Sequence, residues 1–257
     1  MPHVEFRHTF LYRAAFAPAD YCDCDASLEQ LANTVPILRV KSLGLDAIVR
    51  QVEPAIGKNT IDIECDEGNI AQPVSQRPKL TRDEVMAYGA KLSEVAKWAC
   101  DKGTDLSYHH HMGAMVQDAE DIDWLMEGST DDLTLLYDTG HLHFAGADPV
   151  VVLDKWGHRV HHVHFKDVRQ PVLDWVHAED KSFLDGVAAG VYSVPGDPEG
   201  CIDFQAITDK LKAMEYQGWI VVEAEQDPAK APPFEYSKVG FDHITEICGR
   251  SGLAIEK

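Results

Sequence analysis

The chain has 257 residues, of which 45% are hydrophobic and 26% are charged. This is the composition of a globular protein, and it excludes a disordered or collagen-like chain. The 43 acidic residues outnumber the 23 basic ones and give a formal net charge of −20. Because so negative a surface repels phosphate backbones and anionic lipids, we expect neither nucleic acid nor a membrane as a partner.

Targeting and redox features indicate a cytoplasmic protein. The sequence has no run of about 18 apolar residues, so no membrane span is expected. Charged residues interrupt the first 17 positions, which do not match a signal peptide. The six cysteines are scattered and match no zinc framework, so we expect reduced thiols in the cytoplasm.

The N-terminal part of the chain has the least regular pattern. Apolar spacing predicts a helix over residues 28–42 and a strand over 45–50. Residues 60–65 predict a strand or the edge of a loop, and 5–16 are ambiguous. We expect residues 1–25 to pack irregularly or to cover an incomplete side of the domain.

Strands alternate with helices from residue 81 onward. A capping box, Thr81 to Glu84, begins a helix that ends at Gly103. Further strands are predicted at 106–109, 133–137, 159–165 and 219–224, and further helices at 119–126, 149–156, 204–216 and 235–249. This order predicts an α/β fold of parallel β/α units, with six or seven strand candidates. Residues 170–198 predict a long loop of the kind that forms a lid or binding loop.

Histidines gather where the predicted strands end. Ten of the thirteen lie between His109 and His177, in little more than a quarter of the chain. In barrels of alternating strands and helices, the carboxyl ends of the strands hold the active site. We therefore expect the functional residues at this rim.

The first rim segment is YHHHMG at 108–113. Alternation along a strand puts His109 and His111 on one side and His110 on the other. The two outer imidazoles can bind a metal together. A polar loop of hydrogen-bonded imidazoles is the alternative.

The second rim segment, at 137–143, contains Asp138 and His141 before and after a glycine turn. A carboxylate and an imidazole at this spacing can converge on one cation. In the alternative interpretation, Asp138 accepts a hydrogen bond from its own backbone in a turn.

The third rim segment is HHVHFKD at 161–167, in which His162 and His164 share a strand face. A cluster of imidazoles is costly to bury without partners, and a metal is a simple common partner. Imidazole with carboxylate suits manganese, iron, cobalt or zinc. The alternative for His161 and His162 is a hydrogen-bonded core histidine.

The fourth rim segment follows an apolar strand and contains Glu223 and Glu225, which point to one side. Buried carboxylates need a cation or become protonated. Alternatively, Glu225 and Asp227 already lie in solvent. Together the four segments place His, Asp, His and Glu at successive strand ends, which predicts one shared metal site.

The rim segments also resemble a known group. DTGH at 138–141 and HFKD at 164–167 look like the xylose-isomerase-like barrel superfamily. Over about residues 75–250, longer strings are similar to the inosose dehydratases of inositol catabolism: YHHHMG, LLYDTGHLHFAG, VHFKDVR, VPGD and GWIVVEAEQDPAKAP. The resemblance implies a TIM-type (β/α) barrel over residues 1–257. It also implies a hydro-lyase that removes water from 2-keto-myo-inositol with Mn²⁺ or Co²⁺.

Site residues follow from the same resemblance. The implied metal ligands are His109, Asp138, His164 and Glu223. Relatives usually have Glu at the first of these positions, so His111, Glu53 or Glu64 are alternatives to His109. The candidates for proton transfer are Glu225, His141, His111 and Lys166, and those for substrate binding are Tyr108, His143 and Arg169.

Three other functions remain open at this point. A sugar epimerase or isomerase would use the same metal barrel, and an AP-endonuclease-type hydrolase would share its fold, although the net charge opposes DNA binding. An inactive metal-binding barrel is the third, because residues 1–70 depart from the family as a diverged or truncated start. The expected ligand is an uncharged polyol ketone, and a homo-oligomer is left open.

Overall fold

The computed structural model describes residues 4–5, 37–40, 60–65 and 70–256. Their main sheet has eight strands, all paired in parallel, in the order β10-β1-β9-β6-β5-β4-β3-β2. The strands are β1 (Val4–Glu5), β2 (Ile37–Val40), β3 (Thr60–Cys65), β4 (Asp105–His109), β5 (Leu133–Asp138), β6 (Val160–Phe165), β9 (Gly218–Val222) and β10 (Ile255–Glu256). A separate antiparallel pair joins β7 (Asp167–Val168) to β8 (Tyr192–Ser193). The predicted parallel α/β fold is confirmed.

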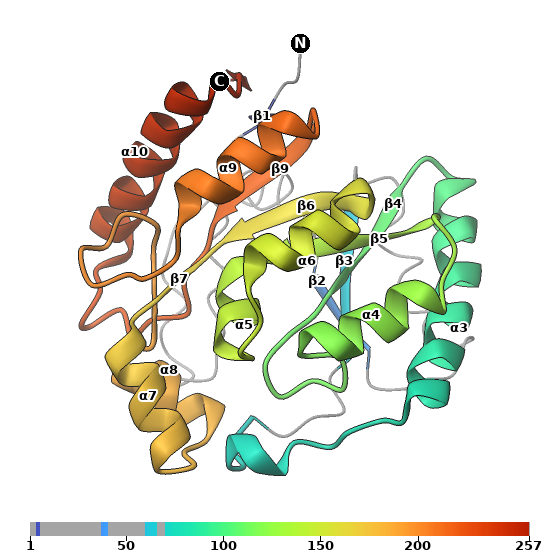
Figure 1. Ribbon diagram of the computed structural model, residues 1–257, viewed down its shortest axis with the longest axis horizontal. Coiled ribbons are helices and arrows are strands. Elements are labelled where there is room, and N and C mark those ends of the chain that lie inside the picture. The colour runs from blue at the N-terminus through green and yellow to red at the C-terminus, as the bar shows by residue number, and fades with distance from the viewer. Residues whose placement is uncertain (1–3, 6–36, 41–59, 66–69, 257) are drawn as a thin grey trace, which may run out of the picture.

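Helices cover the outer, convex face of the curved sheet (Figure 1). The helices of the described residues are α3 (Arg82–Cys100), α4 (Ala119–Glu127), α5 (Thr139–Phe144), α6 (Pro149–Trp156), α7 (Gln170–Ala178), α8 (Phe183–Ala189), α9 (Phe204–Ala213) and α10 (Pro233–Ser251), with short 3-10 turns η2 (Val74–Gln76) and η3 (Gly157–Arg159). No helix in the described ranges is long and apolar enough to cross a membrane.

Local sequence signals explain where these helices begin. Thr81 and Glu84 form the predicted capping box at the start of α3. Asp148 caps α6, and Pro149 occupies the first helical position, where its missing N–H has no cost. Each such cap stabilises a helix by about 1 kcal/mol.

Alternation along the strands separates two environments. Tyr108, Leu135 and Val163 face outward into the main hydrophobic core beneath the helices. Their neighbours His109 and His164 point to the opposite face, because successive side chains of a strand alternate. The chemistry of the strands therefore lies on the concave side of the sheet, away from the helices.

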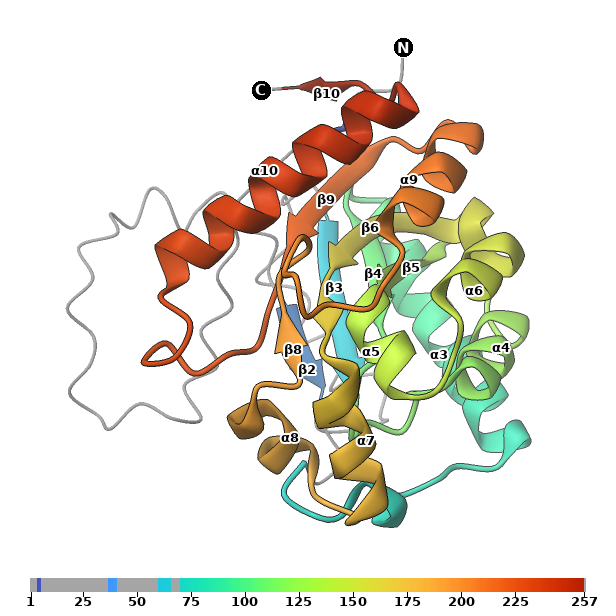
Figure 2. The same ribbon diagram turned by 60° about the vertical axis from the view of Figure 1, so that its left-hand side comes forward.

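The segment predicted as a long loop, 170–198, instead folds into α7, α8 and β8, so that prediction is wrong. These two helices lie together beyond the carboxyl ends of the strands (Figure 2). They share a second hydrophobic core with α5, made of Met112, Phe144, Val168, Leu173, Val176, Phe183, Val187, Val191 and Tyr192. Ser182 caps α8 in a capping box that marks this helix in the sequence. We call residues 170–190 the lid helices.

The N-terminal predictions had mixed outcomes. The helix expected over 28–42 is wrong at Ile37–Val40, which form β2 in register with β3. A short, mostly apolar run fits either a helix or a strand, and these residues form a strand because they pair with β3. The strand predicted at 60–65 is confirmed as β3, whereas 45–50 lies outside the described residues.

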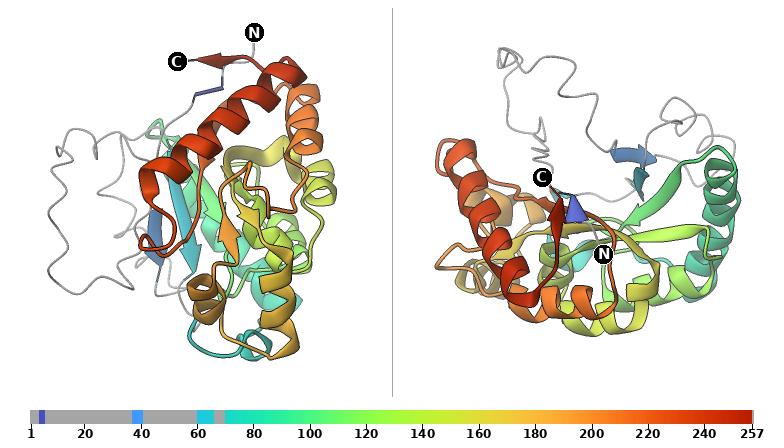
Figure 3. Two further views of the ribbon diagram at one scale, coloured as in Figure 1. Left: turned by 90° about the vertical axis from the view of Figure 1, so that its left-hand side faces the viewer. Right: turned by 90° about the horizontal axis from the view of Figure 1, so that it is seen from above.

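β1 pairs with β9 on one side and with β10 on the other. Within the part of the chain that the structure describes, β2 and β10 form the two edges of the curved sheet (Figure 3). The rest of residues 1–25 lies outside the described ranges, so the expectation for that segment stays a prediction.

Candidate metal centre

Four neighbouring strands bring the predicted site residues to one edge of the sheet. β4, β5, β6 and β9 lie side by side and run parallel, as expected. Asp138 at the end of β5 is directly paired with His164 on β6. His109 ends β4, and Glu223 follows the last residue of β9. Parallel pairing therefore places all four at the same rim.

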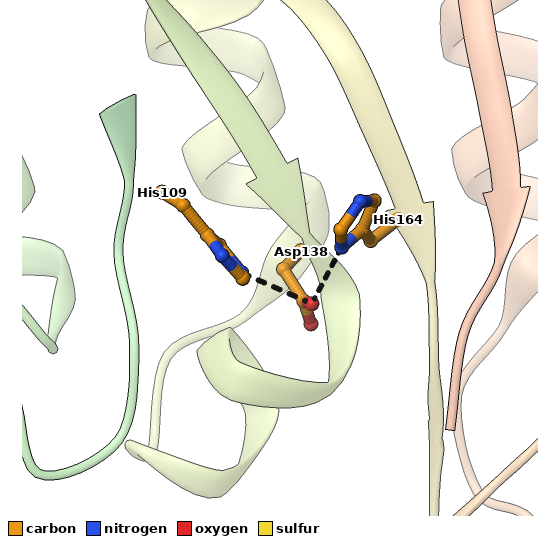
Figure 4. A group of neighbouring side chains, drawn as sticks. All are labelled: His109, Asp138 and His164. Carbon is orange, nitrogen blue, oxygen red and sulfur yellow. Dashed lines mark ion pairs between the residues drawn. The ribbon is translucent and has the colours of Figure 1, made fainter. Parts of the chain in front are cut away.

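His109, Asp138 and His164 form a buried group, which we call the Asp138 group (Figure 4). The distance from Asp138 Oδ2 to His109 Nε2 is 3.4 Å, and that to His164 Nδ1 is 3.5 Å. The other carboxylate oxygen, Oδ1, accepts a hydrogen bond of 2.9 Å from the backbone N–H of His141 and caps α5. The turn interpretation of this segment is confirmed through Oδ1, whereas Oδ2 faces the imidazoles of His109 and His164, and a cation shared by Asp138 and His141 stays a prediction.

The spacing of these atoms fits a divalent ion. Ligand atoms at 2.0–2.2 Å from a tetrahedral metal lie about 3.3–3.6 Å from one another. The two measured separations from Asp138 Oδ2, 3.4 and 3.5 Å, fall in this range. They are long for hydrogen bonds to a carboxylate, which are usually about 2.7–2.9 Å. The donor set of two imidazoles and one carboxylate also suits a transition metal.

The charge states favour metal binding as well. Burial lowers the pKa of His164 despite the nearby Asp138 carboxylate, so its imidazole is neutral and keeps a lone pair. Burial alone would raise the pKa of Asp138, but the charge of Lys166 and contacts with His141 and His109 hold that pKa well below its usual range. The group thus presents one negative charge beside the neutral His164 imidazole.

His110 supports this arrangement from the other side of β4. Its Nε2 accepts a hydrogen bond of 3.3 Å from the backbone N–H of Asp138. Burial, followed by the neighbouring His109, lowers the pKa of His110 to about 3, so the ring is neutral and can accept. The third histidine of the run therefore positions the carboxylate that follows β5.

Lys166 lies at the centre of a second group, which we call the Lys166 group and which also contains Glu223, Glu225, His141 and His111. Its Nζ is fully buried and contacts the carboxylate of Glu223. The same atom lies 3.5 Å from Glu225 Oε2, 3.4 Å from Asp138 Oδ2 and 2.9 Å from His141 Nε2. An ammonium group thus stands between the carboxylates of this rim and compensates their charge.

Gly140 makes room for this lysine. A Cβ atom added at Gly140 would lie 2.5 Å from Lys166 Cγ and 2.6 Å from Cδ. The glycine of the DTGH segment is therefore required by the close approach of the lysine stem. Any larger residue there would displace Lys166 from the carboxylates.

His111 and His141 complete the Lys166 group together with Glu225. Their rings lie 3.8 Å apart, centre to centre. His111 Nε2 is 3.7 Å from Glu225 Oε1, and His141 Nε2 is 3.8 Å from Glu225 Oε2. Burial, followed by His111 and Lys166, lowers the pKa of His141 well below its usual range, so this ring is neutral. The structure brings together all four residues predicted for proton transfer.

Glu223 was predicted as a metal ligand, and the structure places it against Lys166. Lys166 Nζ also approaches Asp138 Oδ2, so the two carboxylates flank one cation. Their shared position beside a positive charge is compatible with a common metal, but the contact that the structure shows is with the lysine.

Three predicted substrate-binding residues lie elsewhere. Tyr108 is buried in the main core, 6.1 Å from the ring of Tyr88, because it alternates with His109 on β4. Arg169 pairs with Asp197 and Glu199. None of these contacts reaches the two groups at the rim.

His143 is the third of these residues, and it lies on α5 beside a separate cavity. Its Nε2 is 2.8 Å from Gln170 Oε1, and Cys201 Sγ is 3.4 Å away. The cavity measures about 550 Å³ and is lined by α5, α6, α7 and α9. The helical turn after Asp138 carries His141 inward and His143 outward.

Sequence reasoning missed two aromatic residues of the site, Phe183 and Tyr192. The Phe183 ring lies 5.4 Å from His111 and 6.0 Å from His141. The Tyr192 hydroxyl is 2.9 Å from His141 Nδ1. Phe183 lies on α8 of the lid helices and Tyr192 on β8, the strand that follows. Both are in the segment that was predicted as a loop. The capping box at Ser182 and the VPGD segment after Tyr192 were the available signals.

Comparisons with known proteins agree with this architecture. The rhizopine catabolism protein MocC of Rhizobium meliloti is 38% identical over 91% of this chain and 68% of its own length. Inosose dehydratases of Geobacillus thermodenitrificans and Glaesserella parasuis are 47% and 44% identical over 71% of this chain. This chain spans 61% and 62% of those two proteins, or about three fifths of their length.

Solved structures share the fold at low sequence identity. The IOLI protein, crystallised with a bound zinc atom, aligns with a TM-score of 0.61 at 16% identity, over 88% of this chain and 83% of that one. The profile of the xylose isomerase-like TIM barrel matches residues 39–247. On that match, with which the parallel sheet agrees, the chain belongs to the xylose isomerase-like TIM barrel family.

Proposed function

We propose that this protein is a metal-dependent hydro-lyase that removes water from 2-keto-myo-inositol (inosose) in inositol catabolism. The observation that carries the proposal is the arrangement at the rim. A carboxylate between neutral imidazoles, fit to hold a divalent ion, adjoins a group with its own ammonium, carboxylates and imidazoles. The likeness to inosose dehydratases supports the choice of substrate.

The Asp138 group would hold the metal, for which we propose Mn²⁺ or Co²⁺. His109, Asp138 and His164 would be ligands, with Glu223 as the fourth. When bound, such an ion supplies Lewis-acid chemistry that stabilises negative charge developing on a ketone oxygen. Two carboxylates and two neutral imidazoles carry a charge of −2, which a divalent ion cancels.

The Lys166 group would move the protons. Elimination of water needs a base for the proton beside the ketone and an acid for the departing hydroxyl. Glu225 is 9% exposed, whereas Lys166 and His141 are fully buried, so a substrate meets the Glu225 carboxylate first. We assign proton abstraction to Glu225, with Lys166 and His141 behind it to position the carboxylate and compensate its charge.

The charge pattern supports an uncharged substrate. Lys166 is engaged by Glu223 and Glu225, and Arg169 is engaged by Asp197 and Glu199. A phosphorylated sugar needs a guanidinium or ammonium group available to its phosphate. An unphosphorylated cyclic polyol ketone fits the described rim better. With free thiols at Cys100, Cys201 and Cys248, we propose that it acts in the cytoplasm.

The test is an assay of purified protein with 2-keto-myo-inositol and added Mn²⁺ or Co²⁺. Elimination produces a conjugated enol or dione, so we expect new ultraviolet absorbance that a chelator prevents. Asp203→Asn, which alters only the cap of α9, is the matched control for Asp138→Asn, and it should keep the activity. Metal-loaded protein that epimerises a ketose, or cleaves abasic DNA, without this absorbance would refute the proposal.

A further inference from the structure

Tyr192 contacts two members of the Lys166 group, Lys166 and His141. It lies on β8, which pairs with β7 directly after Lys166. Its hydroxyl is 2.9 Å from His141 Nδ1. The face of its ring is 4.7 Å from Lys166 Nζ, which is a cation–π distance. The side chain is fully buried in the second core, between the lid helices and α5.

We infer that Tyr192 is a positioning residue that holds His141 through its hydroxyl and Lys166 through its ring. This inference deepens the proposed function and rests on it, since the Lys166 group is the one that we assign to proton transfer.

The hydrogen bonds of His141 explain why a hydroxyl is needed. A neutral imidazole has one N–H and one lone pair. The Met112 backbone N–H, 3.3 Å from His141 Nδ1, can only donate, and the Lys166 ammonium, 2.9 Å from Nε2, also donates. The single lone pair of His141 cannot serve both donors.

The Tyr192 hydroxyl can pair with Nδ1 in either tautomer, because a hydroxyl can both donate and accept. When the His141 lone pair is at Nε2, facing Lys166, the hydroxyl accepts from Nδ1–H. When the lone pair is at Nδ1, the hydroxyl donates to it. Tyr192 thus keeps Nδ1 satisfied in either tautomer and holds the ring in one orientation.

Packing fixes the tyrosine itself. The rings of Phe183 and Phe144 lie 6.0 and 5.8 Å from the Tyr192 ring. Phe183 also lies 5.4 Å from His111, so Phe183 on α8 and Tyr192 on β8 both contact the Lys166 group. A rigid aromatic neighbourhood leaves Tyr192 little freedom to move away from His141.

Two substitutions separate the two contacts. Tyr192→Phe removes the hydroxyl and keeps the ring over Lys166, whereas Tyr192→Leu removes both. The matched control is Tyr216→Phe, since Tyr216 is also buried and its hydroxyl lies 2.8 Å from the carbonyl oxygen of Trp219. Trp219 is at the amino end of β9, opposite the rim.

The first measurement is ¹⁵N NMR of the histidine rings in metal-free protein, with His141 assigned by comparison with His141→Gln. Without the hydroxyl, Met112 N–H is the donor left at Nδ1, so Tyr192→Phe should shift His141 toward the Nε2–H tautomer. Tyr216→Phe should leave the His141 signals unchanged. Identical His141 signals in Tyr192→Phe and in the unaltered protein would overturn the inference.

The second measurement is turnover of 2-keto-myo-inositol with Mn²⁺. We expect Tyr192→Phe to lower kcat about tenfold with KM changed less than about twofold, and Tyr192→Leu to lower kcat about 100-fold, within the range that positioned proton transfer contributes. A kcat of Tyr192→Phe equal to that of Tyr216→Phe would also overturn the inference. If the unaltered protein turns over no substrate, the proposed function fails, and the NMR result decides on Tyr192 alone.

Discussion

The Asp138 group and the Lys166 group lie at the same rim but differ in how their charge is balanced. In the Asp138 group, a carboxylate faces His109 and His164, both at 3.4–3.5 Å. In the Lys166 group, the protein supplies its own cation to Glu223 and Glu225, and the same ammonium also lies 3.4 Å from Asp138 Oδ2. The imidazoles beside Asp138 suit the first group to a cation from solution, whereas the ammonium suits the second group to holding and moving protons.

The two groups form successive layers of the barrel rim. β4, β5, β6 and β9 each contribute one residue to a lower layer, nearer the strand. Each contributes a second residue, two or three positions later, to an upper layer. The pairs are His109 and His111, Asp138 and His141, His164 and Lys166, and Glu223 and Glu225. Side chains two apart on a strand share a face, so one strand end can serve both layers. The layers meet at Lys166 of the upper layer, which contacts Glu223 and lies 3.4 Å from Asp138 Oδ2 of the lower layer.

The largest expected effect is that of Asp138→Asn. Asparagine caps a helix as well as aspartate does, so α5 should keep its start, whereas the charge of the lower layer is lost. Because the charge stabilisation by such a metal is worth several kcal/mol, we expect activity to fall on the order of 1000-fold. Mn²⁺ titration by calorimetry should show lost binding, and Asp203→Asn should bind normally. Unchanged Mn²⁺ affinity in Asp138→Asn would remove the lower layer from consideration as the metal site.

Lys166→Met should have the next largest effect. It keeps most of the stem and removes the cation, which leaves Glu223 and Glu225 buried without their partner. We expect kcat to fall about 100-fold, because Glu225 loses the cation that positions its carboxylate for proton transfer, while Mn²⁺ still binds. Loss of a buried partner also destabilises the fold by about 3–5 kcal/mol, which thermal unfolding would reveal. Metal binding abolished by Lys166→Met but retained in Asp138→Asn would reverse the roles of the two layers.

Glu223→Gln and Glu225→Gln form a matched pair that tests the boundary between the layers. Each substitution removes one carboxylate charge beside Lys166 and keeps the size of the side chain. If Glu223 belongs to the metal layer, its variant should lose about 10–100-fold in Mn²⁺ affinity, a loss of the size seen when groups around a metal are altered. The Glu225 variant should bind Mn²⁺ within about twofold and lose kcat. Equal losses of affinity in both variants would show that the layers are not separate.

The smallest expected effect concerns Asp167, which lies beyond the rim next to Lys166. Burial raises its pKa to about 6, although Oδ1 accepts hydrogen bonds from the backbone N–H groups of Ile202, Val168 and Cys201. Because the pKa in the folded state exceeds the ordinary value of 3.8, the stabilising contribution is complete below that value and is lost as the pH rises through about 6.

Asp167→Asn keeps the accepting oxygen and removes the buried charge. The variant should therefore be more stable than the unaltered protein above pH 6, by on the order of 2 kcal/mol, and the difference should vanish near pH 4. Urea unfolding across this pH range is the measurement. A stability difference that does not vary with pH would contradict the assignment to Asp167.

Sequence patterns predicted the strands of the site well because those strands have two strong signals. Each strand contains buried apolar residues, and each ends in or is followed by polar residues with a carboxylate or an imidazole. The parallel order of β4, β5, β6 and β9 followed from the alternation with helices. The N-terminal helix prediction failed at β2, whose four residues are too few to show a helical or strand period.

The substrate-binding predictions show a different limit. Tyr108 was predicted within the YHHHMG segment of the resemblance, but strand alternation places it opposite His109, in the main core. His143 depended on whether the chain after Asp138 turns into a helix, which the sequence did not reveal. The lid helices were read as a loop because each is under ten residues long, too short for a clear helical period.

The most direct test of the metal assignment is a crystal structure of the protein soaked with Mn²⁺, with anomalous diffraction measured at the manganese edge. We predict one dominant anomalous peak at about 2.0–2.2 Å from Asp138 Oδ2, His109 Nε2 and His164 Nδ1. A dominant peak among His111, His141 and Glu225 instead, or the absence of a peak at the Asp138 group in crystals that diffract well, would contradict the account.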